Sequence, residues 1–144
     1  IASNLKATFI CYNVNILNYL RSKRNLNIIF AGGKFHPQTQ MFESPEGISL
    51  IKSMRATKAF ISAAGVHDNL GLTCVYNYEV QTKKALLSSS VEKILLVDSS
   101  KFGIVKPAYF ANIENFDTII TDSGISAKWK DIIKKRGIKL HIVS

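Results

Sequence analysis

The sequence predicts an α/β fold in which a mostly parallel sheet is covered by helices on both faces. Short runs of β-branched and aromatic residues alternate along the chain with amphipathic stretches about ten residues long. Strands joined in this way by helices pair in parallel and bury both faces of their sheet. The chain has 144 residues, of which 47% are hydrophobic, which is enough for the core of one globular domain. We therefore expect a single domain over residues 1–144.

The first half of the chain begins this alternation. Residues 7–12 are expected to form a strand, and Asn13 can cap a helix that leads to a second strand over 26–31. Residues 44–46, Ser-Pro-Glu, are typical of a helix start, because a hydroxyl cap, an early proline and an acid in the first turn all favour it. This helix is expected to end at about Arg55.

The second half continues with further strands and two helices. Strands are expected over 59–63, 93–97, 118–121 and 138–143. Asn77 is expected to cap a helix that ends near Ser89. Ser126 can cap a helix through Arg136, and Gly137 can end it. All six strands of the chain are expected to lie in one sheet, with their carboxyl ends at one edge.

The net charge of +9 raises the question of nucleic-acid binding. The basic residues are spread along the chain, and no helix-turn-helix, zinc-finger or aromatic stacking motif accompanies them. We interpret them as a solvated basic surface, with direct nucleic-acid binding by this segment as the alternative.

We find no signal-peptide pattern and no membrane-length apolar run, so we expect a cytoplasmic protein with no membrane partner. Cys11 and Cys74 lie in apolar surroundings and are expected to be buried free thiols.

Three polar or glycine-rich loops are expected at the carboxyl edge of the sheet, where ligands of such sheets bind. They cover residues 32–36, 63–68 and 98–103. Glycines let backbone N–H groups approach an anion, and lysines supply the counter-charge. Together these loops predict a site for an anionic small molecule. The candidate ligand-binding residues of the loops are Gly32, Gly33, Lys34, Ala64, Gly65, Asp98 and Lys101.

Some of these residues also have a simpler interpretation. Asp98 and Lys101 could be a turn-forming aspartate and a surface lysine. Glu79 and Lys83 lie four apart on an expected helix, and they are either an ordinary surface ion pair or part of the site. No metal, cofactor or catalytic residue is expected. The three histidines lack metal-ligand spacing, and no serine or cysteine has a base placed to activate it.

The order of these motifs resembles the C-terminal effector domain of DeoR-family repressors over nearly the whole chain. The matching segments are AGGKFH at 31–36, AAGVH at 63–67, GLTC at 71–74, Glu79 with Lys83, DSSKFG at 98–103 and FDTIITD at 116–122. The resemblance implies a Rossmann-like fold similar to ribose-5-phosphate isomerase, glucosamine-6-phosphate deaminase and CoA transferases. It also implies a phosphorylated sugar as effector, with deoxyribose 5-phosphate as one candidate, and a homo-oligomeric repressor that releases DNA when the effector binds.

The resemblance further implies roles for single residues. Asp98 and Lys101 would take part in the effector response, Gly65 in the ligand loop, and Lys83 in the wall of the site. Family members also carry a winged helix-turn-helix and an Asp-x-Gly-Thr-Thr loop ahead of the first strand seen here, and this sequence has neither. We therefore expect a fragment that meets DNA only through an absent N-terminal domain.

The alternative function is an enzyme of the same fold, a sugar-phosphate isomerase or deaminase. Such an enzyme would need a carboxylate general base that faces the sugar carbons. Glu79 or Asp98 could serve by charge, but no second acid–base partner is evident in the sequence.

Overall fold

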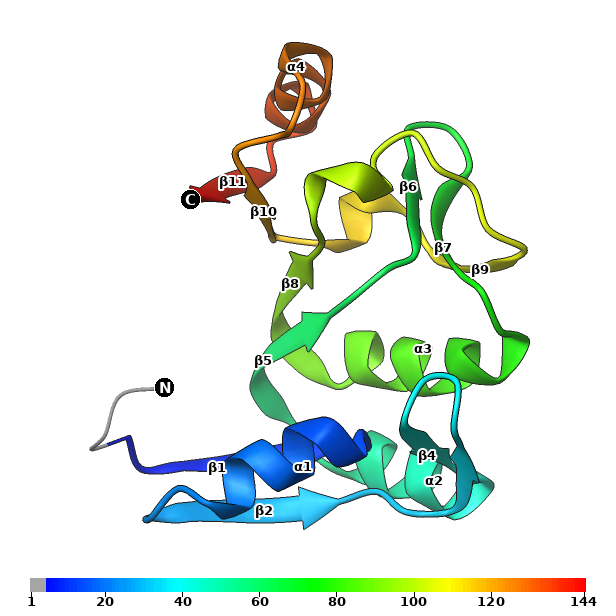
Figure 1. Ribbon diagram of the computed structural model, residues 1–144, viewed down its shortest axis with the longest axis vertical. Coiled ribbons are helices and arrows are strands. Elements are labelled where there is room, and N and C mark those ends of the chain that lie inside the picture. The colour runs from blue at the N-terminus through cyan, green and yellow to red at the C-terminus, as the bar shows by residue number, and fades with distance from the viewer. Residues whose placement is uncertain (1–4) are drawn as a thin grey trace. The chain divides into compact units, whose positions relative to one another are not determined.

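The structure is a computed structural model that describes residues 5–144, and the chain divides into two compact units (Figure 1). Unit 1 covers residues 1–54 and unit 2 covers residues 55–144. The predicted α/β class is confirmed, because unit 2 contains a four-stranded parallel sheet flanked by helices.

The expectation that all six strands share one sheet was wrong. The first two expected strands pair with each other in unit 1, while the other four form the sheet of unit 2. A hydrophobic pattern shows which segments are extended, but it carries no information about which strand edges meet. The pairing of the strands therefore depends on tertiary contacts that the pattern does not encode.

Unit 1 is built from one strand–helix–strand unit followed by a hairpin and a helix. Its elements are β1 (Ala7–Cys11), α1 (Val14–Arg21), β2 (Leu26–Phe30), β3 (Lys34–His36), β4 (Met41–Glu43) and α2 (Pro45–Ser53). β1 and β2 are parallel, and β3 and β4 are antiparallel. Asn13 caps α1 by accepting the Asn15 N–H at 2.9 Å, and Ser44 caps α2 by accepting the Gly47 N–H at 2.9 Å. Both caps are those that the sequence predicts.

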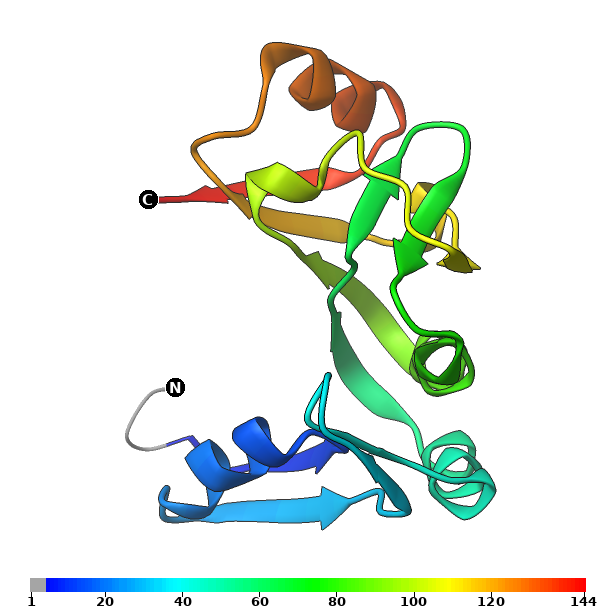
Figure 2. The same ribbon diagram turned by 45° about the vertical axis from the view of Figure 1, so that its right-hand side comes forward.

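Unit 2 contains the parallel sheet and a second, antiparallel sheet (Figures 1 and 2). The parallel sheet has the order β11-β10-β8-β5, formed by β5 (Ala56–Ile61), β8 (Ser90–Leu96), β10 (Thr118–Asp122) and β11 (Lys139–Val143). The antiparallel sheet has the order β6-β7-β9, formed by β6 (Gly65–His67), β7 (Gly71–Cys74) and β9 (Ala108–Ala111). The sequence pattern did not predict this second sheet, because its strands have only three or four residues each.

The helices of unit 2 are α3 (Val80–Ser88) and α4 (Ala127–Lys135), with short 3-10 turns η1 (Asn77–Glu79), η2 (Ser99–Lys101) and η3 (Ile113–Asn115). Ser126 caps α4 by accepting the Trp129 N–H, as predicted. The prediction of Asn77 as a helix cap was wrong. Asn77 lies inside η1, and the carboxylate of Glu79 instead accepts the Tyr76 N–H at 3.1 Å.

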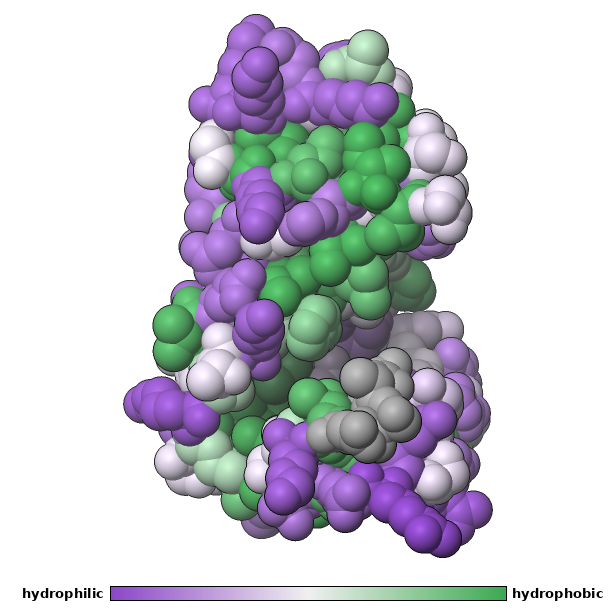
Figure 3. Space-filling model, turned by 90° about the vertical axis from the view of Figure 1, so that its left-hand side faces the viewer, coloured by the Kyte–Doolittle hydropathy of each residue, from purple (hydrophilic) through white to green (hydrophobic). Residues whose placement is uncertain are grey.

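The core of unit 2 lies against one face of the parallel sheet. The strand register aligns Ile61 with Leu95 and Leu95 with Ile119, and all three side chains are buried. Trp129 and Ile133 of α4 belong to the same apolar cluster. On the opposite face Phe60 and Leu96 are exposed, whereas Ile94 and Thr118 are buried, and Figure 3 shows apolar residues on the molecular surface. Side chains that alternate along a strand point to opposite faces, so both faces of this sheet carry buried residues.

Two further observations concern the chain as a whole. Cys11 and Cys74 are free and buried, as expected. Burial raises the pKa of the Cys11 thiol, and it raises the pKa of the Cys74 thiol to about 11. Within residues 5–144, none of the helices combines the length and the apolar character that crossing a membrane requires.

Candidate functional site

The carboxyl edge of the parallel sheet in unit 2 brings two of the predicted site residues, Asp98 and Lys101, together with a second acid, Asp122. The β8–β10 ladder aligns Leu96 with Ile120, and the Val97 N–H donates to the Ile120 carbonyl just beyond it. Asp98, just after β8, and Asp122, the last residue of β10, therefore lie at the same edge of neighbouring parallel strands. This is the edge at which open α/β sheets bind ligands.

Asp98 and Lys101 belong to one turn that begins where β8 ends. Asp98 caps η2, because its Oδ1 accepts the Ser100 N–H at 3.0 Å and also the Ser100 hydroxyl. The Lys101 Nζ lies 3.8 Å from the Asp98 Oδ2. The side chains are 58% exposed for Asp98 and 39% exposed for Lys101, so both can reach a bound molecule. The Ser100 hydroxyl is the main cause that lowers the pKa of Asp98, which keeps this carboxylate charged.

Asp122 is a residue of this edge that the sequence analysis did not select. Its Oδ2 accepts the Ser99 N–H at 2.7 Å, and its Oδ1 accepts the Gly124 N–H at 2.8 Å. These bonds, with that from the Ser99 N–H as the largest cause, lower the pKa of Asp122. The signal was present in the sequence, because Asp122 follows its strand just as Asp98 follows the preceding strand of the sheet.

Gly65 begins β6, and packing explains why this position is a glycine. An added Cβ would overlap the backbone carbonyl of Ile104 and would come within 2.8 Å of the Thr73 Oγ1. The neighbouring Ala64 N–H donates to the Thr73 carbonyl at 2.9 Å. The loop after β5 is therefore fixed by contacts with β7 and with the segment after η2.

Glu79 and Lys83 form their ion pair inside the protein. The Lys83 Nζ donates to the Ser62 carbonyl at 2.5 Å, lies 3.9 Å from the Glu79 Oε1 and sits 4.9 Å from the centre of the Phe110 ring. The interpretation as a surface pair was wrong, because Lys83 is only 4% exposed. Helix α3 packs against both β5 and β9, and spacing along a helix cannot show this. Burial lowers the pKa of Lys83, while the charge of Glu79 opposes that shift.

Gly32, Gly33 and Lys34 lie in unit 1, between β2 and the β3–β4 hairpin. Gly33 has a positive φ of 138°, and a Cβ there would overlap the Glu43 carbonyl. The Ser44 hydroxyl donates to the Gly32 carbonyl at 2.7 Å, which joins this loop to the start of α2. Lys34 is exposed on β3. These three candidate residues thus belong to unit 1, and the other candidate residues belong to unit 2.

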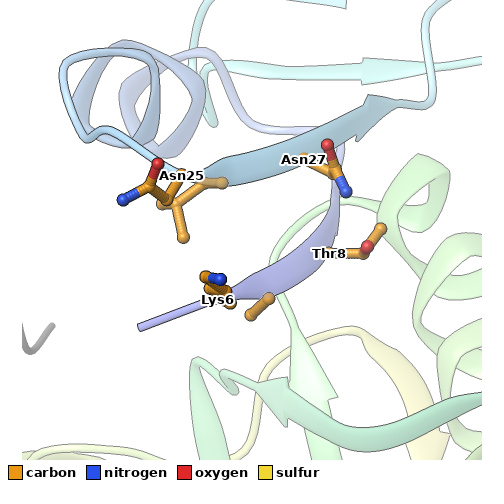
Figure 4. A pocket seen from close by; sticks show the side chains of 6 residues that line it. Lys6, Thr8, Asn25 and Asn27 are labelled. Atoms are coloured by element: carbon orange, nitrogen blue, oxygen red, sulfur yellow. The ribbon is translucent and has the colours of Figure 1, made fainter. Parts of the chain in front are cut away.

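A shallow pocket of unit 1 lies at the amino-terminal ends of two parallel strands. Its walls are Lys6, Ala7, Thr8, Asn25, Leu26 and Asn27 (Figure 4). These residues belong to the amino-terminal ends of β1 and β2, whereas ligands of parallel sheets bind at the carboxyl ends. Among residues 5–144, no group of three or more His, Cys, Asp or Glu side chains gathers that could hold a metal ion.

Residues 1–123 match the family model of the DeoR C-terminal sensor domain. The chain belongs to this family. The match includes the loops at 31–36, 63–67 and 98–103 and the segment that ends at Asp122, so the resemblance carried by these motifs is confirmed.

Three relatives match this sensor domain with nearly the same sequence identity. The deoxyribose operon repressor of Escherichia coli (strain K12) is 30% identical over 140 residues, which cover 97% of this chain and 56% of the relative. The segment from Ser62 to His67, followed by Gly71 and Thr73–Cys74, had suggested this particular resemblance. The regulator GolR of Listeria innocua is 31% identical over 123 residues, covering 85% of this chain and 48% of the relative.

The lactose phosphotransferase system repressor of Staphylococcus epidermidis is 30% identical over 137 residues, covering 94% of this chain and 52% of that protein. The sensor domain described here therefore spans about half the length of these relatives. Their names describe transcription regulators, and two of them name sugar-related systems.

Proposed function

We propose that this sensor domain binds a phosphorylated sugar at the carboxyl edge of the unit 2 sheet and thereby controls a transcription repressor of which it is a part. The observation that carries the proposal is the turn from Asp98 to Lys101, which presents one exposed carboxylate and one exposed ammonium group 3.8 Å apart. A carboxylate can accept hydrogen bonds from sugar hydroxyls, and a lysine can neutralise a phosphate. The relatives named for deoxyribose and lactose systems support a sugar-derived effector.

The chemistry of the site favours binding over catalysis. Glu79 is engaged with buried Lys83 and with the Tyr76 N–H, so it is not free to act as a general base toward a ligand. Asp98 has a lowered pKa, which makes it a weak base. A sensor needs only a ligand that binds one conformation better than another, and an exposed turn with two charges can supply that difference.

The proposal assigns DNA recognition to another part of the full-length repressor. Specific DNA binding requires side chains that read base edges, and we find no such motif in this sequence. Deoxyribose 5-phosphate is the first effector to test, because a relative is named for the deoxyribose operon. We also propose that the full-length protein is a homo-oligomer, in keeping with the symmetry that most soluble oligomers share.

The test is a melting curve of the full-length protein against a panel of pentose and hexose phosphates. A ligand that binds only the native state raises the melting temperature with the logarithm of its concentration. A rise with one sugar phosphate and none with the unphosphorylated sugar is the expected result. A parallel turnover assay on the same panel checks the alternative, since conversion of any sugar phosphate would identify an isomerase or a deaminase instead.

A further inference from the structure

The turn that carries Asp98 and Lys101 is held in place by a carboxylate from the neighbouring strand. The Asp122 carboxylate at the end of β10 accepts the Ser99 N–H, and Ser99 directly follows Asp98 in that turn. We propose that Asp122 is a positioning residue for the effector response, because it fixes where Asp98 and Lys101 stand relative to a bound sugar phosphate. The proposal deepens the proposed function and rests on it.

Both oxygens of Asp122 are used, and each accepts from a backbone N–H. Oδ2 accepts from Ser99 at 2.7 Å, and Oδ1 accepts from Gly124 at 2.8 Å. An asparagine at this position has one acceptor oxygen and one donor nitrogen, so it can satisfy only one of the two N–H groups. The Asp98 cap on Ser100 does not involve Asp122, so the turn itself would persist but would lose its tie to β10.

Gly124 shows how closely the two loops pack. A Cβ on Gly124 would overlap the Ser99 Oγ, would lie 2.9 Å from the Asp122 Oδ1 and would lie 3.2 Å from the Ser99 Cβ. The close approach requires a residue without a side chain at 124. The turn and the end of β10 therefore fit together as one assembly, with Asp122 between them.

The other side of the same turn is joined to two further elements. The Gly103 N–H donates to the Val66 carbonyl of β6 at 2.7 Å, and the Phe102 ring lies 5.1 Å from the Trp129 ring of α4. A ligand that moves Asp98 or Lys101 would therefore have to strain the hydrogen bond from the Ser99 N–H to Asp122 and the contacts of the turn with β6 and α4. Differential binding to two positions of this turn is what a sensor response needs.

The experiment compares Asp122→Asn with a matched variant in the full-length protein. Asp117→Asn is the control, because the Asp117 Oδ2 accepts the Lys93 N–H at 2.8 Å and so ties the same two strands at their other end. We expect Asp122→Asn to raise the sugar-phosphate concentration for half-release of operator DNA by about tenfold, through lost preorganisation of the turn. Asp117→Asn is expected to change the melting temperature only.

A second variant sharpens the test. Gly124→Ala should also weaken the response, because the new methyl group would overlap the Ser99 Oγ and come within 2.9 Å of the Asp122 Oδ1. A readout without ligand is the amide hydrogen exchange of Ser99, which should become faster in Asp122→Asn and stay unchanged in Asp117→Asn.

The outcomes distinguish the positioning role of Asp122 from the proposed effector function of the domain. If the two Asn variants respond to the sugar phosphate alike, or if Ser99 exchange is the same in Asp122→Asn and the parent, Asp122 does not position the turn. If the parent itself responds to no sugar phosphate while Ser99 exchange changes as expected, Asp122 holds the turn and the proposed effector function is what fails.

Discussion

Two aspartates at the same sheet edge have different environments. Asp98 is more than half exposed and is bonded by one residue of its own turn, Ser100, with Lys101 nearby. Asp122 is partly buried, and both of its oxygens accept backbone N–H groups. The exposed acid and its lysine are therefore suited to meeting a ligand, while the partly buried acid is suited to holding the loop that presents them.

The first prediction concerns the exposed pair. Asp98→Asn or Lys101→Ala in the full-length protein should leave folding and operator binding intact but weaken operator release by the sugar phosphate. Loss of a charged hydrogen bond to the effector should raise the concentration required by roughly tenfold to a hundredfold. An operator-release titration beside a melting curve measures both effects, with Lys84→Ala as a control on an exposed lysine of α3. Variants that respond like the parent would show that the site is elsewhere, and variants that unfold would show a structural role.

The second prediction concerns the buried thiol of Cys74. Its pKa is raised from 9.0 to about 11, chiefly by burial. Between these two pH values the unfolded chain loses the thiol proton while the folded chain keeps it, so the free energy of unfolding falls as pH rises. The contribution is complete below pH 9.0 and is lost as the pH passes about 11. Denaturant unfolding across this range should show a shallower decline in Cys74→Ala than in the parent. Identical slopes would mean that the thiol titrates alike in both states.

At the scale of elements, the sequence predicted what local chemistry determines. The Asn13, Ser44 and Ser126 caps form as expected, because a cap depends on residues two or three positions away. The antiparallel sheet β6-β7-β9 was not predicted, since its strands are short and the β7–β9 pairing joins residues far apart in the chain. The burial of Lys83 was missed for the same reason. Of the candidate site, the Asp98–Lys101 turn could be found from sequence, but the contact of Asp122 with it could not.

The third prediction tests the fit of β6 against its neighbours. Gly65→Ala should destabilise the protein by about 1–3 kcal/mol, because the methyl group would overlap the Ile104 carbonyl and approach Thr73. Gly32→Ala is the matched control, since a Cβ there has nothing within 4 Å, and its stability should stay within about 0.5 kcal/mol of the parent. Chemical denaturation of both variants measures the difference. Equal stabilities would contradict the packing explanation for Gly65.

At the scale of the whole molecule, the charge of +9 and the family assignment point to different partners. A net positive protein attracts any polyanion, and this attraction needs no specific site. Several of the basic residues are already paired, including Arg136 with Glu114 at 2.7 Å and Lys135 with Asp131 at 2.8 Å. Charge alone therefore predicts weak, sequence-independent association with DNA.

The last prediction separates that association from operator recognition. Residues 1–144 alone should bind an operator fragment and a scrambled fragment of equal length with the same affinity, because they carry no motif that reads base edges. The affinity for both should fall linearly with salt on a logarithmic scale, since binding through phosphates releases counterions. A gel-shift titration of both fragments at several salt concentrations measures this. A footprint confined to the operator would instead assign specific DNA recognition to this sensor domain. Side chains of its basic surface would then contact base edges rather than only solvent.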